Sequence, residues 1–139
     1  MAVVAVGLAL FSAGCAGPGT SDNVEIVRGD SSRFSVAEIE AAEAAVMERF
    51  KSFKGCNLLR LRYDEVFSDN GTEVYMKYGG GLEGEVAIDN VIVLESEFHV
   101  GKFGGDGSLN RDSDYTGWSW TLTRDSPSSP WQVTDYGQG

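Results

Sequence analysis

The chain has 139 residues, of which 42% are hydrophobic and 11% aromatic, enough for one globular domain with a sizeable core. Its formal net charge is −10, from 21 acidic residues against 11 lysines and arginines that are scattered along the sequence. Because phosphate groups and anionic lipids attract clustered positive charge, this balance argues against nucleic acid as a partner and against electrostatic docking to anionic lipid.

The amino terminus reads as an export signal. Met1–Phe11 is an apolar run too short to span a bilayer, and it is followed by the small residues Ser12–Gly14 and then by Cys15. This order resembles a bacterial lipoprotein signal, in which the cysteine is lipidated. The resemblance implies a signal peptide over residues 1–14, a membrane anchor through lipid on Cys15, and a location in the bacterial cell envelope outside the cytoplasm. Ordinary secretion with cleavage nearby and a core helix are the alternatives.

The state of the second cysteine depends on the first. If Cys15 carries lipid, we expect Cys56 to be a lone, buried thiol. If Cys15 is not lipidated, an exported chain can close a disulfide between Cys15 and Cys56. The sequence leaves both possibilities open.

Residues 15–33 are predicted to form a tether. Ala16–Asn23 is small and polar, with one proline and two glycines, a composition typical of a flexible spacer. Val24–Val27 is a candidate short edge strand, and Arg28–Arg33 is predicted to be a loop. The domain proper is then expected over residues 34–139.

A long helix is predicted from about Val36 to Lys54. Ser35 and Glu38 have the spacing of a capping box, and Gly55 is a natural stop. The apolar residues that recur at helical spacing are Ile39, Ala42, Val46, Phe50 and Phe53, whereas Glu40, Glu43, Glu48 and Lys51 lie mostly off that stripe. The pattern predicts a helix that covers one face of a sheet.

The segment Glu85–Val100 alternates over more residues than any other. Its even positions are mostly apolar, and its odd positions include Glu95, Glu97 and His99. The alternation predicts a long central strand with one face under the helix and the other face in water.

Shorter strands are predicted on either side of this segment. In Asn57–Tyr63, Leu59, Leu61 and Tyr63 share one face. Tyr115–Arg124 alternates Trp118, Trp120 and Leu122 against small polar residues, and Trp131 with Val133 marks a last strand.

The region between Asp64 and Gly84 carries a weaker pattern. Ser68–Gly71 is predicted to be a turn, Thr72–Tyr78 a short helix or hairpin arm, and Gly79–Gly81 a flexible link.

These elements predict an α+β fold in which one long N-terminal helix packs across a curled antiparallel sheet of three to five strands. Five segments, FKGCNLLRLRYDE, VIVLESEFHV, GGDGSLN, YTGWSWTLTRD and PWQV, together resemble a family of unknown function found in bacterial surface lipoproteins. The resemblance covers about Phe34 to Gly137 and implies a cystatin-like fold related to the nuclear transport factor 2 cone. The chain departs from it at Val66–Gly84, where the resemblance implies a charged helix and the sequence has glycines.

Catalytic chemistry is weighed against structural roles. Tyr63 and Asp64 are neighbours on a strand and therefore face opposite ways, so they cannot both line one cavity. His99 shares a polar face with Glu95 and Glu97, which favours solvation over a metal site. The loop from Asp106 to Asp114 resembles a calcium loop only faintly, because its twelfth position is Gly117 and not glutamate. We therefore expect no catalytic, metal or cofactor site.

The tryptophans are expected mainly in the core, with a candidate ligand pocket formed by Tyr63, Asp64, Glu65, Trp118 and Trp120. The predicted function is that of an uncharacterised envelope lipoprotein with a non-enzymatic binding domain. Its partner is either a protein, including a second copy, on the open sheet face or a small ligand. The alternative is a small-molecule enzyme or ligand carrier that uses a cone-shaped cavity between helix and sheet.

Overall fold

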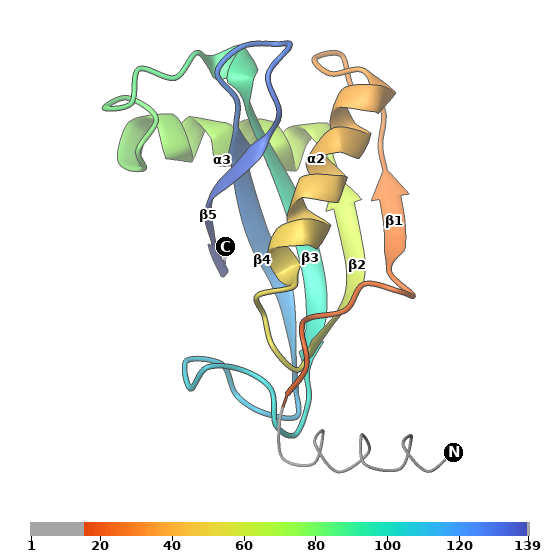
Figure 1. The fold of residues 1–139 in the computed structure, drawn as a ribbon. Helices are drawn as coiled ribbons and strands as arrows, with labels where there is room; N and C mark the ends of the chain where they lie inside the picture. Colours follow the sequence, from red (N-terminus) through yellow and green to blue (C-terminus); the bar gives the residue numbers. More distant parts are fainter. Residues whose placement is uncertain (1–15, 139) are drawn as a thin grey trace, which may run out of the picture.

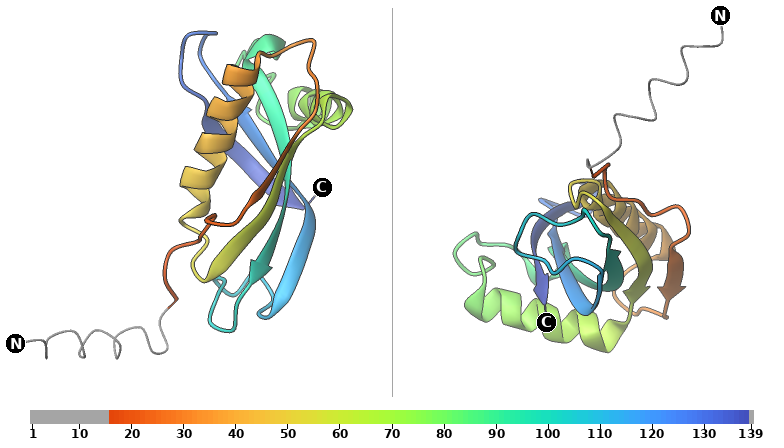
Figure 2. Two further views of the ribbon diagram at one scale, coloured as in Figure 1. Left: turned by 90° about the vertical axis from the view of Figure 1, so that its right-hand side faces the viewer. Right: turned by 90° about the horizontal axis from the view of Figure 1, so that it is seen from below.

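Five strands form one sheet with a helix on each face, as Figures 1 and 2 show for the computed structural model, which describes residues 16–138. The strand order is β1-β2-β3-β4-β5, with β1 parallel to β2 and every later pair antiparallel. Along the chain the elements are β1 (Glu25–Arg28), α2 (Val36–Phe50), β2 (Cys56–Tyr63), α3 (Glu65–Tyr78), the 3-10 turn η1 (Ile88–Asn90), β3 (Val91–Val100), β4 (Ser113–Thr123) and β5 (Gln132–Gln138). The α+β class is confirmed, with a second long helix, α3, where the sequence predicted a turn followed by a short helix or hairpin arm.

The first helix, α2, begins as predicted. The Ser35 hydroxyl accepts the Glu38 N–H at 3.1 Å, and the Glu38 carboxylate accepts the Ser35 N–H at 2.9 Å. Its buried stripe of Ile39, Ala42, Val46 and Phe50 faces the sheet, so the helix covers the apolar side. It ends four residues earlier than predicted, and the turns that follow lead to Gly55, whose φ of 73° favours glycine.

The central strand, β3, has the predicted buried face, but its other face is only partly in solvent. Ile92, Leu94 and Phe98 are fully buried against α2, whereas Val91 and Val93 on the opposite face are buried as well. Helix α3 crosses that face over the first half of β3, as the view from below in Figure 2 shows. The strand starts at Val91, six residues later than predicted, because Ile88–Asn90 forms the 3-10 turn.

Helix α3 replaces the turn predicted at Ser68–Gly71 and includes Thr72–Tyr78, where the helix is confirmed over the hairpin arm. Asp64 caps it by accepting the Phe67 N–H at 2.9 Å. Ser68 Oγ accepts the Val93 N–H at 3.0 Å, a buried group that would otherwise lack a partner at this end of the sheet. A β-carbon on Gly71 would lie 2.9 Å from a methyl group of Val93, so glycine is needed here for close packing and not for a turn.

Strand β2 also departs from the predicted alternation. A β-bulge between Leu58 and Arg60 shifts the register against β3. As a result Leu58 is buried and Leu59 is 38% exposed, whereas the sequence placed Leu59 on the buried face with Leu61 and Tyr63. A further register shift lies between Ser96 and Phe98, opposite a stretch of β4 that contains Gly117 at a φ of 66°.

The chain joins the domain soon after residue 16. Gly17 accepts the Gly55 N–H at 2.8 Å, and Thr20 forms an isolated bridge with Asn57. The predicted short strand is present as β1, which pairs with β2 along its four residues. Within residues 16–138, neither helix has the length and apolar composition that crossing a membrane requires.

Candidate functional site

The five residues predicted to form a ligand pocket are split between the core and one end of the sheet. Tyr63, Trp118 and Trp120 belong to the hydrophobic core. Asp64 is the helix cap described above, and Glu65 opens α3 beside it. The structure therefore does not bring these five side chains together in one pocket.

Tyr63 and Glu65 hold the loop that precedes α2. The Tyr63 hydroxyl shares a hydrogen bond of 2.9 Å with Ser31, and Glu65 accepts the Ser32 N–H at 2.7 Å and the Ser31 hydroxyl at 3.0 Å. Burial raises the pKa of Tyr63, whereas the Ser32 and Ser31 donors lower the pKa of Glu65. Glu65 is thus an ionised acceptor that fixes a loop, which is a structural role.

The interior between α2 and the sheet is filled by side chains. Phe50 packs edge-on against Phe98 at 5.6 Å between ring centroids and against Trp120 at 6.4 Å. The Trp120 indole N–H donates to the buried Ser96 hydroxyl at 2.8 Å. A ligand enclosed midway between helix and sheet, as predicted for the cone, has no room here.

An opening is found instead beside the C-terminal end of α2. A half-open cavity of about 370 Å³ lies there, which is within the range of about 300–1,000 Å³ typical of small-ligand sites. We call it the end cavity, and its lining residues are Ser52, Phe53, Lys54, Gly105, Asp106, Ser108, Leu109, Trp118 and Tyr136. It lies at the Cys56 end of β2, whereas Asp64 and Glu65 follow the opposite end of that strand.

Three aromatic rings form the apolar wall of the end cavity. The Trp118 and Tyr136 rings stack at 6.2 Å, and Phe53 lies 5.2 Å from Tyr136 and 6.1 Å from Trp118. Tyr136 is 40% exposed, and the Arg49 guanidinium lies 5.4 Å from its ring centroid. Flat or apolar molecules can pack against such a wall while a polar edge stays near the mouth.

The polar groups of the end cavity carry both charges. Asp106 accepts the Ser108 N–H at 2.9 Å and also the Ser108 hydroxyl, and these bonds lower the pKa of the Asp106 carboxyl. Lys54 supplies a cation on the same rim. The Trp118 indole N–H is buried and has no hydrogen-bond partner among residues 16–138. The rim of the end cavity thus offers an ionised acceptor and a cation, which can orient the polar groups of a ligand.

The residues weighed as metal ligands have other partners. His99 Nδ1 and the Asp114 carboxylate share a hydrogen bond of 2.6 Å, and Glu95 pairs with Arg62. The part of the chain that the structure describes contains no cluster of three potential metal-binding side chains.

Sequence reasoning found Trp118 but missed the rest of the end cavity. Phe53 was assigned to the helix stripe, yet it lies beyond the end of α2 and turns toward β5. Tyr136 was missed because the last strand extends to Gln138, well past the predicted Val133. The alternation of Thr134, Asp135 and Tyr136 was the available signal for a longer last strand, although three residues make a weak pattern.

Cys56 is almost fully buried and has no disulfide partner among residues 16–138, and burial raises the pKa of its thiol. Cys15, and with it the lipid anchor and the alternative disulfide, lies outside the described residues.

Comparison with protein-family models, curated proteins and solved structures finds no match to this chain.

Proposed function

We propose that this chain is a cell-envelope lipoprotein, anchored by lipid on Cys15, whose domain binds a small ligand in the end cavity without transforming it. The carrying observation is the end cavity itself, where the rings of Phe53, Trp118 and Tyr136 meet at an opening of about 370 Å³. The finer fold assignment, a cystatin-like relative of the nuclear transport factor 2 cone, is part of the proposal. It is supported by α2 lying across the curled sheet (Figure 1).

Chemistry at the site favours binding over catalysis. A general acid in such a cavity needs a raised carboxyl pKa, whereas the Ser108 hydrogen bonds lower that of Asp106. Asp106 therefore stays ionised and accepts hydrogen bonds at neutral pH. The ligand class that fits is a small aromatic or apolar molecule with a polar edge for Lys54 or Asp106.

A cavity-filling variant tests this function. Ser52 is exposed on the rim, so Ser52→Trp adds bulk across the opening while every aromatic wall residue remains. We expect a small molecule to co-purify with the wild-type protein from native envelopes and to be lost from Ser52→Trp, because the added indole occupies its place. Mass spectrometry of the denatured samples measures this difference.

Ser128→Trp is the matched control, since Ser128 lies in the exposed turn before β5. It should retain the molecule at the wild-type ratio. Equal recovery of the same compounds from Ser52→Trp and wild type would contradict the proposal, as would the absence of any bound compound.

The homodimer predicted through the open sheet face stays a prediction. Sedimentation velocity on the purified domain checks it directly.

A further inference from the structure

The outer edge of β5 has no strand partner among residues 16–138, because β5 is last in the sheet order. Edge strands present unpaired backbone groups that can accept another strand. Here the Tyr136 N–H donates to the carboxylate of its neighbour Asp135 at 2.9 Å, so a side chain satisfies it locally. An added strand would pair with the outer edge of β5 and, where the Tyr136 N–H is needed, would displace the Asp135 carboxylate from it.

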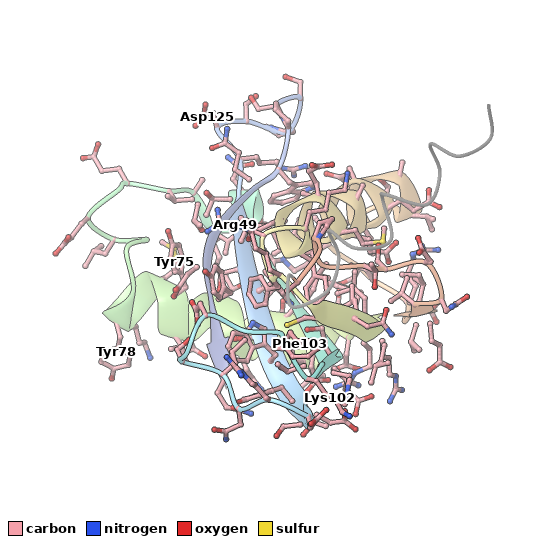
Figure 3. The ribbon with its side chains drawn as sticks, turned by 60° about the horizontal axis from the view of Figure 1, so that its bottom comes forward. Arg49, Tyr75, Tyr78, Lys102, Phe103 and Asp125 are labelled. Atoms are coloured by element: carbon pink, nitrogen blue, oxygen red, sulfur yellow. The ribbon has the colours of Figure 1, made fainter. Side chains whose placement is uncertain are left out.

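A groove runs from this edge beneath α3. It measures about 430 Å³, and its lining residues are Phe67, Asn70, Gly71, Val74, Tyr75, Tyr78, Gly79, Val93, Ser119, Thr121 and Asp135. Val74 is 58% exposed and Tyr78 is 83% exposed, and Figure 3 shows Tyr75 and Tyr78 projecting from α3. Asp135 is the one charged residue among these lining residues. We call this surface the α3 groove.

A second copy of the chain is a poor occupant of the β5 edge. The middle residue of β5 is Asp135, so full antiparallel pairing of two β5 strands would set the two Asp135 carboxylates opposite each other. Each copy also carries a net charge of −10. Charge complementarity points instead to a positively charged segment.

We propose that β5 accepts an extended, basic peptide segment of another protein as a sixth strand. In this arrangement the backbone of the segment pairs with the outer edge of β5, and every second side chain faces the α3 groove. A lysine or arginine at the centre meets Asp135, and apolar residues two positions away meet Tyr75, Tyr78 and Val74. This interaction is separate from small-ligand binding in the end cavity.

A symmetric peptide is a suitable probe, because it fits either strand direction. The probe is acetyl-Thr-Val-Thr-Lys-Thr-Val-Thr-amide with a fluorescent label, and its control peptide has Glu in place of Lys. We expect the lysine peptide to bind and to shift the backbone amide resonances of residues 132–138. A third peptide, N-methylated on its edge-facing amides, should not bind, since it cannot donate to β5.

Charge reversal at Asp135 tests the pairing. Asp135→Lys should weaken binding of the lysine peptide about fivefold to tenfold and favour the glutamate peptide, in line with a surface ion pair turned into a repulsion. Asp125→Lys changes the net charge equally but lies in the exposed turn before β5, so it should alter affinity by less than about twofold. Asp135→Asn removes only the charge, so its affinity for the lysine peptide tests the same pairing if the charge reversal disturbs folding.

Several results would overturn the proposal. These are equal binding of the N-methylated peptide, equal effects of the Asp125 and Asp135 substitutions, or no binding of any peptide at millimolar concentration. Ser52→Trp separates the two proposals, because it should leave peptide affinity unchanged even though it blocks the end cavity.

Discussion

At the scale of single residues, Arg124 connects three parts of the fold. Its guanidinium donates to Glu38 at 2.7 Å, to the Asn90 side chain at 3.1 Å and to the Asp89 carbonyl at 3.2 Å. It also lies 4.3 Å from the ring centroid of Trp131. Because the side chain is only 5% exposed, these partners compensate for the desolvation of its charge. They join the start of α2 to η1 and to the end of β4.

The same contact predicts a loss of stability in acid. The Ser35 N–H and then Arg124 lower the folded-state pKa of Glu38 below its ordinary value. A lowered folded pKa gives stability that is present above the unfolded pKa of about 4.3 and is lost as pH falls through the folded value. We expect the urea midpoint of Glu38→Gln to lie below that of wild type at pH 7 and the gap to narrow toward pH 3.

Glu48→Gln is the matched control for that series. Glu48 is exposed, and its ion pair is with Lys51, just past the end of α2, so its substitution should move the midpoint little at any pH. If the difference in urea midpoint between wild type and Glu38→Gln stayed constant with pH, the ionised Glu38 carboxylate would not be a source of stability.

Residue spacing predicted the capping box at the start of α2 but not the buried ion pair of Glu43. The capping box of Ser35 and Glu38 is local, so the sequence predicted it. Glu43 was placed on the solvent side of the helix, yet it is 4% exposed, because Arg28 of β1 donates to it at 2.6 and 3.0 Å. That partner lies 15 residues away on another element, beyond the reach of helical periodicity.

At the scale of elements, α3 contains a glycine, Gly71, that indicated a turn in a segment that is helical. Gly71 follows Ser, Asp and Asn, a composition that indicates a turn. The chain is helical there because Asp64 caps the helix and because Ser68 and Gly71 fit against β3. Strand β1 and helix α2 were predicted because their signals are local. Helix α3 was predicted only in its second half, and there only as one of two alternatives, since its first half depends on contact with Val93.

Gly71→Ala should therefore destabilise the protein although it favours a helix. Alanine gains about 0.5–1 kcal/mol in helix propensity, whereas overpacking costs about 1–3 kcal/mol, so we expect a net loss of about 1 kcal/mol in the free energy of unfolding. Chemical denaturation measures it. Asn70→Ala, at the exposed neighbour in the same helix, should be neutral or slightly stabilising.

A double-mutant cycle with Val93→Ala locates the cause. If the clash is with Val93, Gly71→Ala should be tolerated better in the Val93→Ala background. If Gly71→Ala lowered the free energy of unfolding equally in both backgrounds, its cost would not come from contact with Val93.

At the scale of the whole molecule, the sequence predicted the layout better than the site. One apolar sheet face, its covering helix and the aromatic core follow from alternation and spacing. The end cavity depends on Phe53, Trp118 and Tyr136, which meet from three separate segments after β-bulges have bent the sheet. Bulges break the period that sequence reasoning uses, so the cavity could not be placed from the sequence alone.

The lipid anchor gives a prediction for the intact protein in cells. Cys15→Ser removes the proposed acylation site, so we expect the protein to move from the membrane fraction to the soluble envelope fraction and to lose incorporation of labelled palmitate. Cys56→Ser is the matched control and should stay in the membrane fraction, because that thiol is buried in the domain. Unchanged fractionation of Cys15→Ser would contradict lipidation at this residue.

The place where the chain enters the domain sets how an anchored molecule is oriented. Gly17 is hydrogen-bonded to Gly55, and the neighbouring Lys54 carbonyl accepts the Gly105 N–H at 3.0 Å. Because Lys54 and Gly105 line the end cavity, the start of the described chain lies beside its rim. Two extended residues span at most about 7 Å, so a lipid on Cys15 would hold that rim close to the outer surface of the leaflet. The end of the domain that carries the cavity would then lie beside the bilayer, and α3 would lie farther from it (Figure 1). Amphiphilic molecules leaving the membrane would meet Tyr136 and Trp118 before they reached bulk water.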